Sequence, residues 1–344
     1  MRGTKFRLLV LATAALLIAG CSSSTGGDGA SDAPLSGKTI DFVVPYEPGG
    51  GFDLYVRLIA PHLAKELDAR IVVRNEPAAG GIAAMNKTWN AEPDGTRILL
   101  ADIPGGILNE LSGQGGARYK IADFSWMARV AGEPETVVSS AKDGAKSMES
   151  LVDTDKELVF SSVGVYDSDS IGAQLVGEVF DLKVKTVTGF DGAPEAFTAV
   201  LRGDTDAFNV SAGSARDYEK NGEGKALAVL DTKTSEVLPD VMPLSEVPGA
   251  EDNKDLIEIH GALVSSGRSI IGPPKLPKEI LDAYRKALDK VLNDPSFLKE
   301  AKAQERVVQY LSGEEVADLV SAAASDPDPR YIELIKRAGE NAAG

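Results

Sequence analysis

The chain has 344 residues, of which 43% are hydrophobic and 26% charged, proportions typical of a globular protein with room for two domains. Its formal net charge of −16 at pH 7 argues against a nucleic-acid partner, because phosphates need neutralising cations. Cys21 is the single cysteine, which excludes an intramolecular disulfide and a metal site built from several cysteines.

Residues 1–20 are typical of a targeting segment. Three cations precede an apolar run, Leu8–Ile18, that is too short to span a bilayer. The run leads into Ile-Ala-Gly-Cys, which resembles the lipobox of bacterial lipoproteins. We therefore expect residues 1–20 to form a lipoprotein signal peptide, Cys21 to be lipidated, and residues 21–37 to form a flexible linker. The alternative is an ordinary signal peptide followed by an incidental cysteine.

The next stretch, residues 40–67, predicts a strand, a glycine loop and a helix. Ile40–Val44 is a short β-rich apolar run, and Gly49–Gly51 allow backbone angles closed to other residues. Asp53 is a candidate N-cap for the helix. Backbone N–H groups at a helix N-terminus can bind a carboxylate or a phosphate. The alternative is a tight turn without a ligand, and the spacing matches neither a P-loop nor GxGxxG.

A second unit of the same kind follows. Arg70–Arg74 is a predicted strand, Asn75–Gly81 a second glycine loop and Ile82–Ala91 a helix, and a third strand follows at Arg97–Ala101. Two consecutive strand–loop–helix units predict a parallel sheet with right-handed crossovers. Both loops then open at the carboxyl ends of the strands, where open α/β sheets bind ligands. We expect an anion site there.

The alternation of strands and helices restarts after a pair of predicted strands, Trp126–Val130 and Glu135–Ser140. Strands and helices then alternate to residue 230. An apolar stretch from His260 predicts a strand that returns to the first domain, and residues 278–338 predict helices that pack on it.

These elements predict two α/β domains. Domain 1 would comprise residues 38–140 and 262–344, and domain 2 would comprise residues 141–261. The chain would cross between them near Ser139–Lys142 and near His260–Val264. Domain interfaces are a common place for small-molecule pockets, so we expect a ligand cleft between the two domains.

Several segments carry a family resemblance, namely PYEPGGGFDLYVRLIAPHL, NEPAAGGIAAM, AEPDGTRILLA, SSVGVYDSDSIGAQLVGEVF, TGFDGAPEAFTAVLRGDTDAF and GRSIIGPPKLPKEILDAYRKALDKVLNDPSFLKEA. They are similar to the substrate-binding proteins of tripartite tricarboxylate transporters, also called the Bug family. The resemblance implies an α/β fold of the type II periplasmic-binding-protein kind, whose two domains close over a small organic acid. It also implies an extracytoplasmic protein, lipid-anchored to the bacterial cell membrane, that delivers this carboxylate to the transporter's membrane subunits without a cofactor.

The resemblance also implies which residues bind the ligand. Two glycine loops, Tyr46–Asp53 and Asn75–Gly81, would grip a carboxylate through backbone groups, with Ile103–Gly105 as a third loop. Segments Ser162–Ser168 and Gly189–Gly192 would face them from domain 2. The expected ligand-binding residues are Tyr46, Pro48, Gly49, Gly50, Phe52, Asp53, Ala79, Gly80, Gly81, Ile103, Pro104, Val163, Tyr166, Asp167, Phe190 and Asn209.

The second half of this expected site departs from the family pattern. Many members have a Gly-Ser pair and a histidine where this chain has Tyr166–Ser168 and Gln174. Asp167 or Asp169 could therefore recognise a cationic or amino group on the ligand. Phe190 could stack on a ligand, and packing in the core is its alternative role.

Other functional classes fit the residues less well. The two histidines, His62 and His260, lie far apart in the chain, which is more typical of packing or surface residues than of metal ligands. Asp191, Glu195 and the Asp167–Asp169 pair fit solvated loop acids or helix N-terminal charges better than acid–base pairs, and no serine lies in a GxSxG motif. We therefore predict a binding protein, not an enzyme. A ligand-sensing lipoprotein and an α/β enzyme that acts on a carboxylate are the alternatives.

Overall fold

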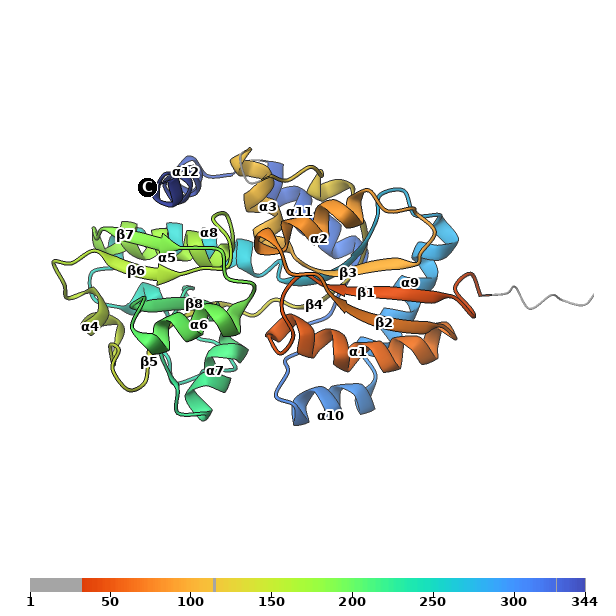
Figure 1. Cartoon of the computed structure of the whole chain (residues 1–344), viewed down its shortest axis with the longest axis horizontal. Helices are drawn as coiled ribbons and strands as arrows, with labels where there is room; N and C mark the ends of the chain where they lie inside the picture. Colours follow the sequence, from red (N-terminus) through yellow and green to blue (C-terminus); the bar gives the residue numbers. More distant parts are fainter. Residues whose placement is uncertain (1–32, 114–115, 326, 344) are drawn as a thin grey trace, which may run out of the picture. The chain divides into compact units, whose positions relative to one another are not determined.

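The computed structural model describes residues 33–113, 116–325 and 327–343. Within them the chain forms two mixed β-sheets that carry helices on their faces (Figure 1). We call each sheet with its helices a lobe. The predicted signal peptide, Cys21 and most of the predicted linker lie outside the described residues.

The first lobe is built on a sheet of six strands in the order β11-β4-β10-β3-β1-β2. β1 pairs in parallel with β2 and β3, which confirms the parallel arrangement predicted from the two strand–loop–helix units. β10 runs antiparallel between β3 and β4. The strands are β1 (Thr39–Val44), β2 (Arg70–Asn75), β3 (Arg97–Asp102), β4 (Ser125–Ala131), β10 (Arg268–Gly272) and β11 (Leu311–Ser312).

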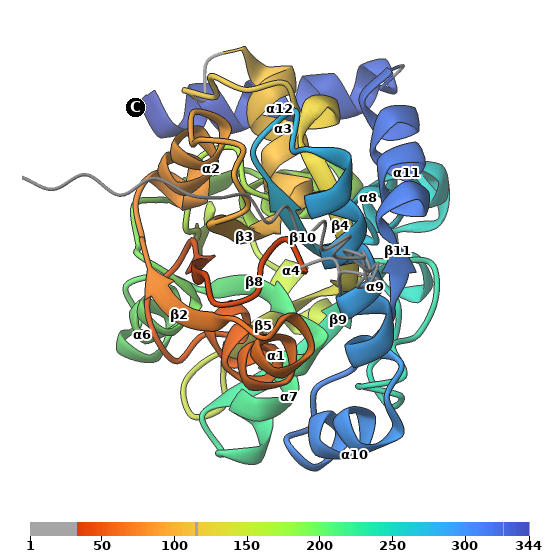
Figure 2. The ribbon, with the colours of Figure 1, turned by 90° about the vertical axis from the view of Figure 1, so that its right-hand side faces the viewer.

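Helices cover both faces of this sheet. Figures 1 and 2 show α2 and α3 on one side of it and α1 on the other. Phe42 and Leu100 belong to the core shared with α1 and α9, whereas Val43 and Leu99 belong to the core shared with α2 and α3. Successive side chains of a strand point to opposite faces, so burial on both faces needs an unbroken apolar run. The helices are α1 (Gly51–Leu67), α2 (Ile82–Trp89), α3 (Ile103–Ser112), α9 (Lys278–Leu292), α10 (Pro295–Ala303) and α11 (Gly313–Ser325).

The second lobe is built on a sheet of five strands in the order β7-β6-β8-β5-β9. β6 is parallel to β7 and β8, and β5 is antiparallel to β8 and β9. The strands are β5 (Glu135–Ser140), β6 (Leu158–Ser161), β7 (Val184–Val187), β8 (Ala207–Ser211) and β9 (Gly224–Val229). The helices are α4 (Met148–Val152), α5 (Ser168–Phe180), α6 (Ala193–Arg202), α7 (Ala212–Lys220) and α8 (Lys254–Val264).

The chain passes between the sheets twice, and the first crossing lies earlier in the chain than predicted. It leaves the first sheet through Gly132–Pro134, before β5, and not after it near Ser139–Lys142. It returns through Ser265–Gly267, between α8 and β10. The predicted boundary at residue 140 therefore follows a strand that already belongs to the second lobe.

The apolar stretch from His260 contains the predicted returning strand, β10, which pairs with β3 and β4 in the first sheet. The strand begins only at Arg268, and the residues from His260 to Val264 form the end of α8 instead. Leu256, His260 and Leu263 are buried at helical spacing, so one face of the helix explains the apolar pattern that suggested a strand.

The C-terminal helix, α12 (Pro329–Ala343), packs against α5 and β7 of the second lobe and also contacts α3. Asn341 Nδ2 donates to Gln174 Oε1 at 3.0 Å, and Arg337 pairs with Glu178 at 2.5 Å. Predicted domain 1 included all of residues 262–344, whereas these contacts attach its last helix to the second lobe. In the described part of the chain we find no helix with the length and apolar character that crossing a membrane requires.

Candidate functional site

A cavity lies between the two lobes, at the C-terminal ends of β1, β3, β6 and β8. About 110 Å³ of it is accessible to the centre of a water molecule, and one bound water needs roughly 10–15 Å³, so the cavity suits a small solute. Its lining comprises Tyr46, Glu47, Gly50, Gly51, Phe52, Asp102, Pro104, Ala131, Glu133, Glu135, Val163, Asp167, Ser168, Asp169, Ala193, Pro194, Phe208, Asn209, Val210, Ser211, Ser214, Val264, Gly267 and Arg268.

The structure brings only part of the predicted site together. The predicted residues that line the cavity are Tyr46, Gly50, Phe52, Pro104, Val163, Asp167 and Asn209. The predicted residues that do not line it are Pro48, Gly49, Asp53, Ala79, Gly80, Gly81, Ile103, Tyr166 and Phe190. Phe190 packs beside α6 and lines a separate depression, and Tyr166 is buried in the core near Gly339 of α12.

Asp53 lies beneath the first glycine loop and holds it in place. Its Oδ2 accepts hydrogen bonds from the backbone N–H of Gly49 at 2.9 Å and from Arg57 Nε at 2.8 Å, and Asn75 Nδ2 donates to Oδ1 at 3.0 Å. Burial alone would raise the pKa of Asp53, but these hydrogen bonds lower it below its ordinary value. Asp53 is not the N-cap that its position suggested, since α1 begins at Gly51. The Asp53 carboxylate therefore fixes the position of the glycine loop through these hydrogen bonds.

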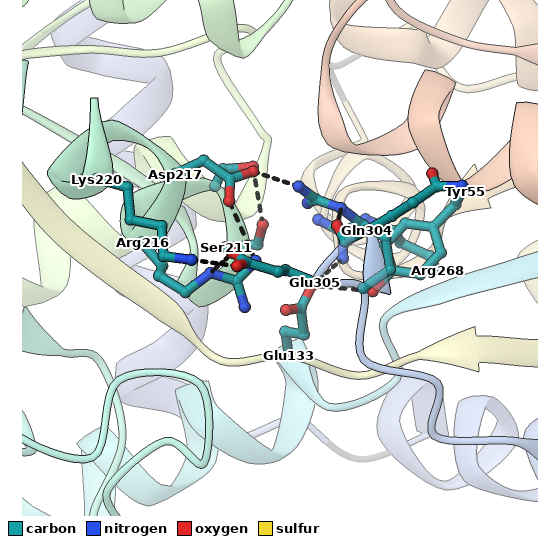
Figure 3. Close-up of polar contacts among 11 residues, drawn as sticks. Tyr55, Glu133, Ser211, Arg216, Asp217, Lys220, Arg268, Gln304 and Glu305 are labelled. Carbon is teal, nitrogen blue, oxygen red and sulfur yellow. Dashed lines mark hydrogen bonds and ion pairs between the residues drawn. The ribbon is translucent and has the colours of Figure 1, made fainter. Parts of the chain in front are cut away.

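Arg268, which opens β10, is the cation of the cavity wall. Its Nη1 donates to Glu133 Oε2 at 2.7 Å, and its guanidinium lies over the rings of Phe52 and Tyr55, 4.9 and 5.3 Å from their centroids (Figure 3 shows Arg268, Glu133 and Tyr55). Arg268 Nε is buried and has no hydrogen-bond partner. A Cβ built on Gly51 would lie 3.3 Å from Arg268 Nη2, so the guanidinium also faces the N-terminus of α1.

The N-terminus of α7, in the second lobe, also lies beside Gly51. The same Cβ on Gly51 would lie 3.4 Å from Ser214 Oγ, which is 3.3 Å from Ser211 Oγ. Helix N-termini expose backbone N–H groups and carry a partial positive charge. We call Gly50, Gly51, Ser214 and Arg268 the basic region of the cavity. The region can receive an anionic group.

Four acids form a second polar region, the carboxylate cluster, which comprises Asp102, Glu135, Asp167 and Asp169. A Cβ on Gly105 would lie 2.7 Å from both Asp102 Oδ2 and Asp167 Oδ1, so these two carboxyl groups are close neighbours. Asp102 is the cross-strand partner of Arg268 in the β3–β10 ladder, which places the cluster directly beside the basic region.

Burial and mutual repulsion perturb this cluster. Burial, followed by the charge of Glu135, raises the pKa of Asp102 to about 6 and that of Asp169 to about 7. The pKa of Asp167 is raised well above its ordinary value by burial and by the charges of Asp169, Asp102 and Glu135. Like charges in a desolvated site favour the protonated form of each carboxyl group.

Hydrogen bonds within the second lobe hold the carboxyl groups of Asp169 and Glu135 in position. Asp169 Oδ1 accepts from Ser162 Oγ at 2.7 Å and its Oδ2 accepts from the Val163 N–H at 3.0 Å. Glu135 Oε1 accepts from Ser168 Oγ at 2.5 Å, while its Oε2 lies 3.4 Å from Nε2 of the buried His260.

Sequence reasoning singled out Asp167 and Asp169, although it favoured solvated positions for them and both are buried. It missed Asp102, Glu133, Glu135 and Arg268. Three of these lie at an end of a buried strand: Asp102 ends β3, Glu135 begins β5 and Arg268 begins β10. A charged residue at the boundary of a buried apolar run was the signal that could have identified them.

Comparisons with known proteins agree with this architecture. A family model described as "Tripartite tricarboxylate transporter family receptor" matches residues 55–336. A UPF0065 protein of Bordetella pertussis is 25% identical over 84% of this chain and 85% of the relative. The solved structure of the periplasmic binding protein BugD matches with a TM-score of 0.73 at 22% identity, over 88% of this chain and 98% of BugD. MatC from Rhodopseudomonas palustris, solved with bound malate, matches with a TM-score of 0.71 at 19% identity, over 87% of this chain and 99% of MatC. The likeness confirms the predicted periplasmic-binding-protein fold.

Proposed function

Because this chain belongs to the tripartite tricarboxylate transporter receptor family, we propose that it captures a small organic acid outside the cytoplasm and presents it to the membrane subunits of a transporter of that kind. The observation that carries the proposal is the cavity between the lobes, in which a buried arginine faces the first glycine loop. The two lobes would act as the two domains that close over the ligand. MatC, which has the same fold, binds malate.

A carboxylate of the ligand would bind in the basic region. Arg268 Nε is free to donate, and the N–H groups at the start of α1 and the hydroxyl of Ser214 lie beside it. Each hydrogen bond to a charged oxygen contributes about 1.5–3 kcal/mol, and each helix N-terminus about 0.3–1 kcal/mol. Three such hydrogen bonds contribute about 4.5–9 kcal/mol, part of which offsets the cost of immobilising the ligand, so micromolar binding, about −8 kcal/mol, also needs apolar burial in the cavity.

The proposed receptor would be anchored through a lipid on Cys21, with the linker that follows holding the lobes off the membrane surface. Residues 1–20 would serve as its signal peptide. A ligand-sensing role would use the same cavity. An enzyme would convert its ligand, whereas a receptor returns it unchanged.

Calorimetry with the variant Gly51→Ala tests the proposal. The added methyl group would stand 3.3–3.4 Å from Arg268 Nη2 and Ser214 Oγ, in the space where the carboxylate would bind. Alanine favours the helix over glycine, so the variant should be at least as stable as the parent protein. We expect at least a tenfold loss of affinity for carboxylates found by screening mono-, di- and tricarboxylic acids.

His62→Ala is the matched control on the same helix, because His62 faces Glu300 at 2.9 Å and does not line the cavity. Its affinity should equal that of the parent protein. Full affinity in Gly51→Ala, or recovery of a chemically altered ligand by NMR, would contradict the proposed binding role.

A further inference from the structure

The carboxylate cluster is unexplained by a ligand that carries only acidic groups. Asp102, Asp167 and Asp169 line the cavity, and Asp167 and Asp169 are more than nine-tenths buried. In the described part of the chain, no lysine or arginine forms an ion pair with any of these three, and Arg268 pairs with Glu133 instead. Burying carboxylates without a cation is costly, so the cluster needs a positively charged partner or bound protons.

Asp167 supplies an independent sign that this partner is a ligand. It is 3% exposed, and its Oδ1 has no hydrogen-bond partner. This oxygen lies beside Asp102 Oδ2, near Gly105, at the cavity wall. Asp102 Oδ2 accepts a hydrogen bond from the Tyr46 hydroxyl at 3.2 Å, and a carboxylate oxygen can accept more than one. The two neighbouring oxygens can therefore accept further hydrogen bonds from a donor group placed in the cavity.

The geometry favours an organic cation over a metal ion. Among the described residues, no group of three or more histidine, cysteine, aspartate or glutamate side chains is arranged to hold a metal. A primary ammonium group needs only acceptor oxygens for its N–H donors. Asp102 and Arg268 are cross-strand partners, whose Cβ atoms lie about 4.5–5.5 Å apart in such pairs. A negative and a positive binding region thus stand side by side, as the two charges of a small zwitterion require.

We propose that the ligand carries a protonated amino group together with its carboxylate, and that Asp102 and Asp167 bind the ammonium while the basic region binds the carboxylate. This inference rests on the proposed receptor function and narrows its ligand to small amino acids or related amine-bearing acids. Asp169 and Glu135, which have hydrogen bonds of their own, add negative charge behind the contact pair. The ammonium group would neutralise the buried negative charge of the carboxylate cluster. Without a ligand, only protonation of these carboxyl groups neutralises that charge.

Calorimetry at pH 8 with matched ligand pairs tests the inference. Each pair is an amino acid and the same acid without its amino group: aspartate with succinate, glutamate with glutarate, and β-alanine with propionate. We expect the amine-bearing member of at least one pair to bind ten times more tightly than its counterpart. Asp167→Asn should lose that preference, and it should fold, because it removes a buried charge whose Oδ1 has no partner.

The control is Asp181→Asn, at the other end of α5, where an exposed residue with φ of 53° accommodates asparagine. It should keep the parent preference. Acids without an amino group that bind as tightly as their partners, or a preference that survives in both Asp167→Asn and Asp102→Asn, would overturn the inference and leave the receptor function standing. Absence of binding by every compound, including the wider panel of carboxylates, would overturn both.

Discussion

Arg306 and Asp217 form an ion pair that joins the two lobes, and Figure 3 shows Asp217 among its neighbours. Asp217 lies on α7 of the second lobe, whereas Arg306 follows α10 of the first. A second contact runs parallel to it, because Arg216 Nη2 donates to the backbone oxygen of Glu305 at 2.6 Å and Lys220 pairs with the Glu305 side chain. These contacts favour the arrangement in which the lobes lie together.

Asp217→Asn should therefore weaken ligand binding without changing the cavity. If the paired arrangement is the one that binds, loss of a partly exposed ion pair should reduce affinity by about two- to fivefold. Calorimetry at low salt measures this, and the difference from the parent protein should shrink at high salt. The exposed Asp240→Asn, in the same lobe, is the control. Equal affinities of parent and variant at low salt would show that the pair has no part in closure.

The carboxylate cluster should make stability depend on pH. The pKa of Asp102 is raised to about 6 and that of Asp169 to about 7, by burial and the charge of Glu135. An unfolded aspartate has a pKa of about 3.9, so the native state binds more protons between about pH 4 and pH 7. Stability is then greatest at the acidic end of this range and falls as pH rises through the native pKa values.

We expect the Tm of the ligand-free protein to be several degrees higher at pH 5.5 than at pH 8, at about 2–4 °C per kcal/mol. Asp102→Asn should flatten this dependence. Glu76 acts in the opposite direction only at lower pH, because its hydrogen bond with Arg97 lowers its pKa to about 2. Thermal melts across the range provide the measurement, and a Tm that climbs steadily from pH 5.5 to pH 8 would contradict it.

Arg268→Gln should destabilise the protein as well as abolish binding. It would leave Glu133, whose side chain is 3% exposed, without its cation, and an unpaired buried charge costs about 3–5 kcal/mol. Adding Glu133→Gln should restore much of this stability but not the binding. Urea denaturation and calorimetry of the single and double variants separate the two effects. A double variant as unstable as Arg268→Gln would show that the loss arises from packing against Phe52 and Tyr55.

Cys21→Ser should release the protein from the membrane fraction. The expectation rests on the charged N-terminal region, the short apolar run and the lone cysteine after Ile-Ala-Gly. Fractionation of cells that express the parent protein and the variant measures it. Membrane association that persists in the variant would exclude lipidation at this position.

Local patterns in the sequence predicted the elements better than the site. The runs around Ile40–Val44 and Arg70–Arg74 have strand composition and are followed by glycine loops, so the two strand–loop–helix units could be read directly. The stretch from His260 does contain the returning strand, β10, but its first residues belong to α8, because a short buried run has no period that separates a strand from a helix. Asp53 failed as a cap because its side chain turns back to Gly49. Only the folded loop shows that contact.

Local sequence patterns could not predict which residues form the cavity. Asp102, Glu133 and Arg268 come from three segments that meet only when β10 inserts between β3 and β4. No spacing in the chain links them. The second glycine loop was predicted to hold a ligand, but its glycines do not line the cavity: Gly81 lies against Pro45 and Tyr46, and Gly80 lies against Asp167.

That last contact has a consequence for the solutes that a cell could collect. A Cβ on Gly80 would lie 2.8 Å from Asp167 Oδ2, so a carboxylate of the chain itself rests against the second loop. A solute whose second carboxylate approached this carboxyl group would meet repulsion whenever Asp167 is ionised. In a mixture of solutes the protein would thus favour acids whose amino group offsets the charge of Asp167. A single substitution at position 167 would then change which solutes the protein binds while leaving the fold intact.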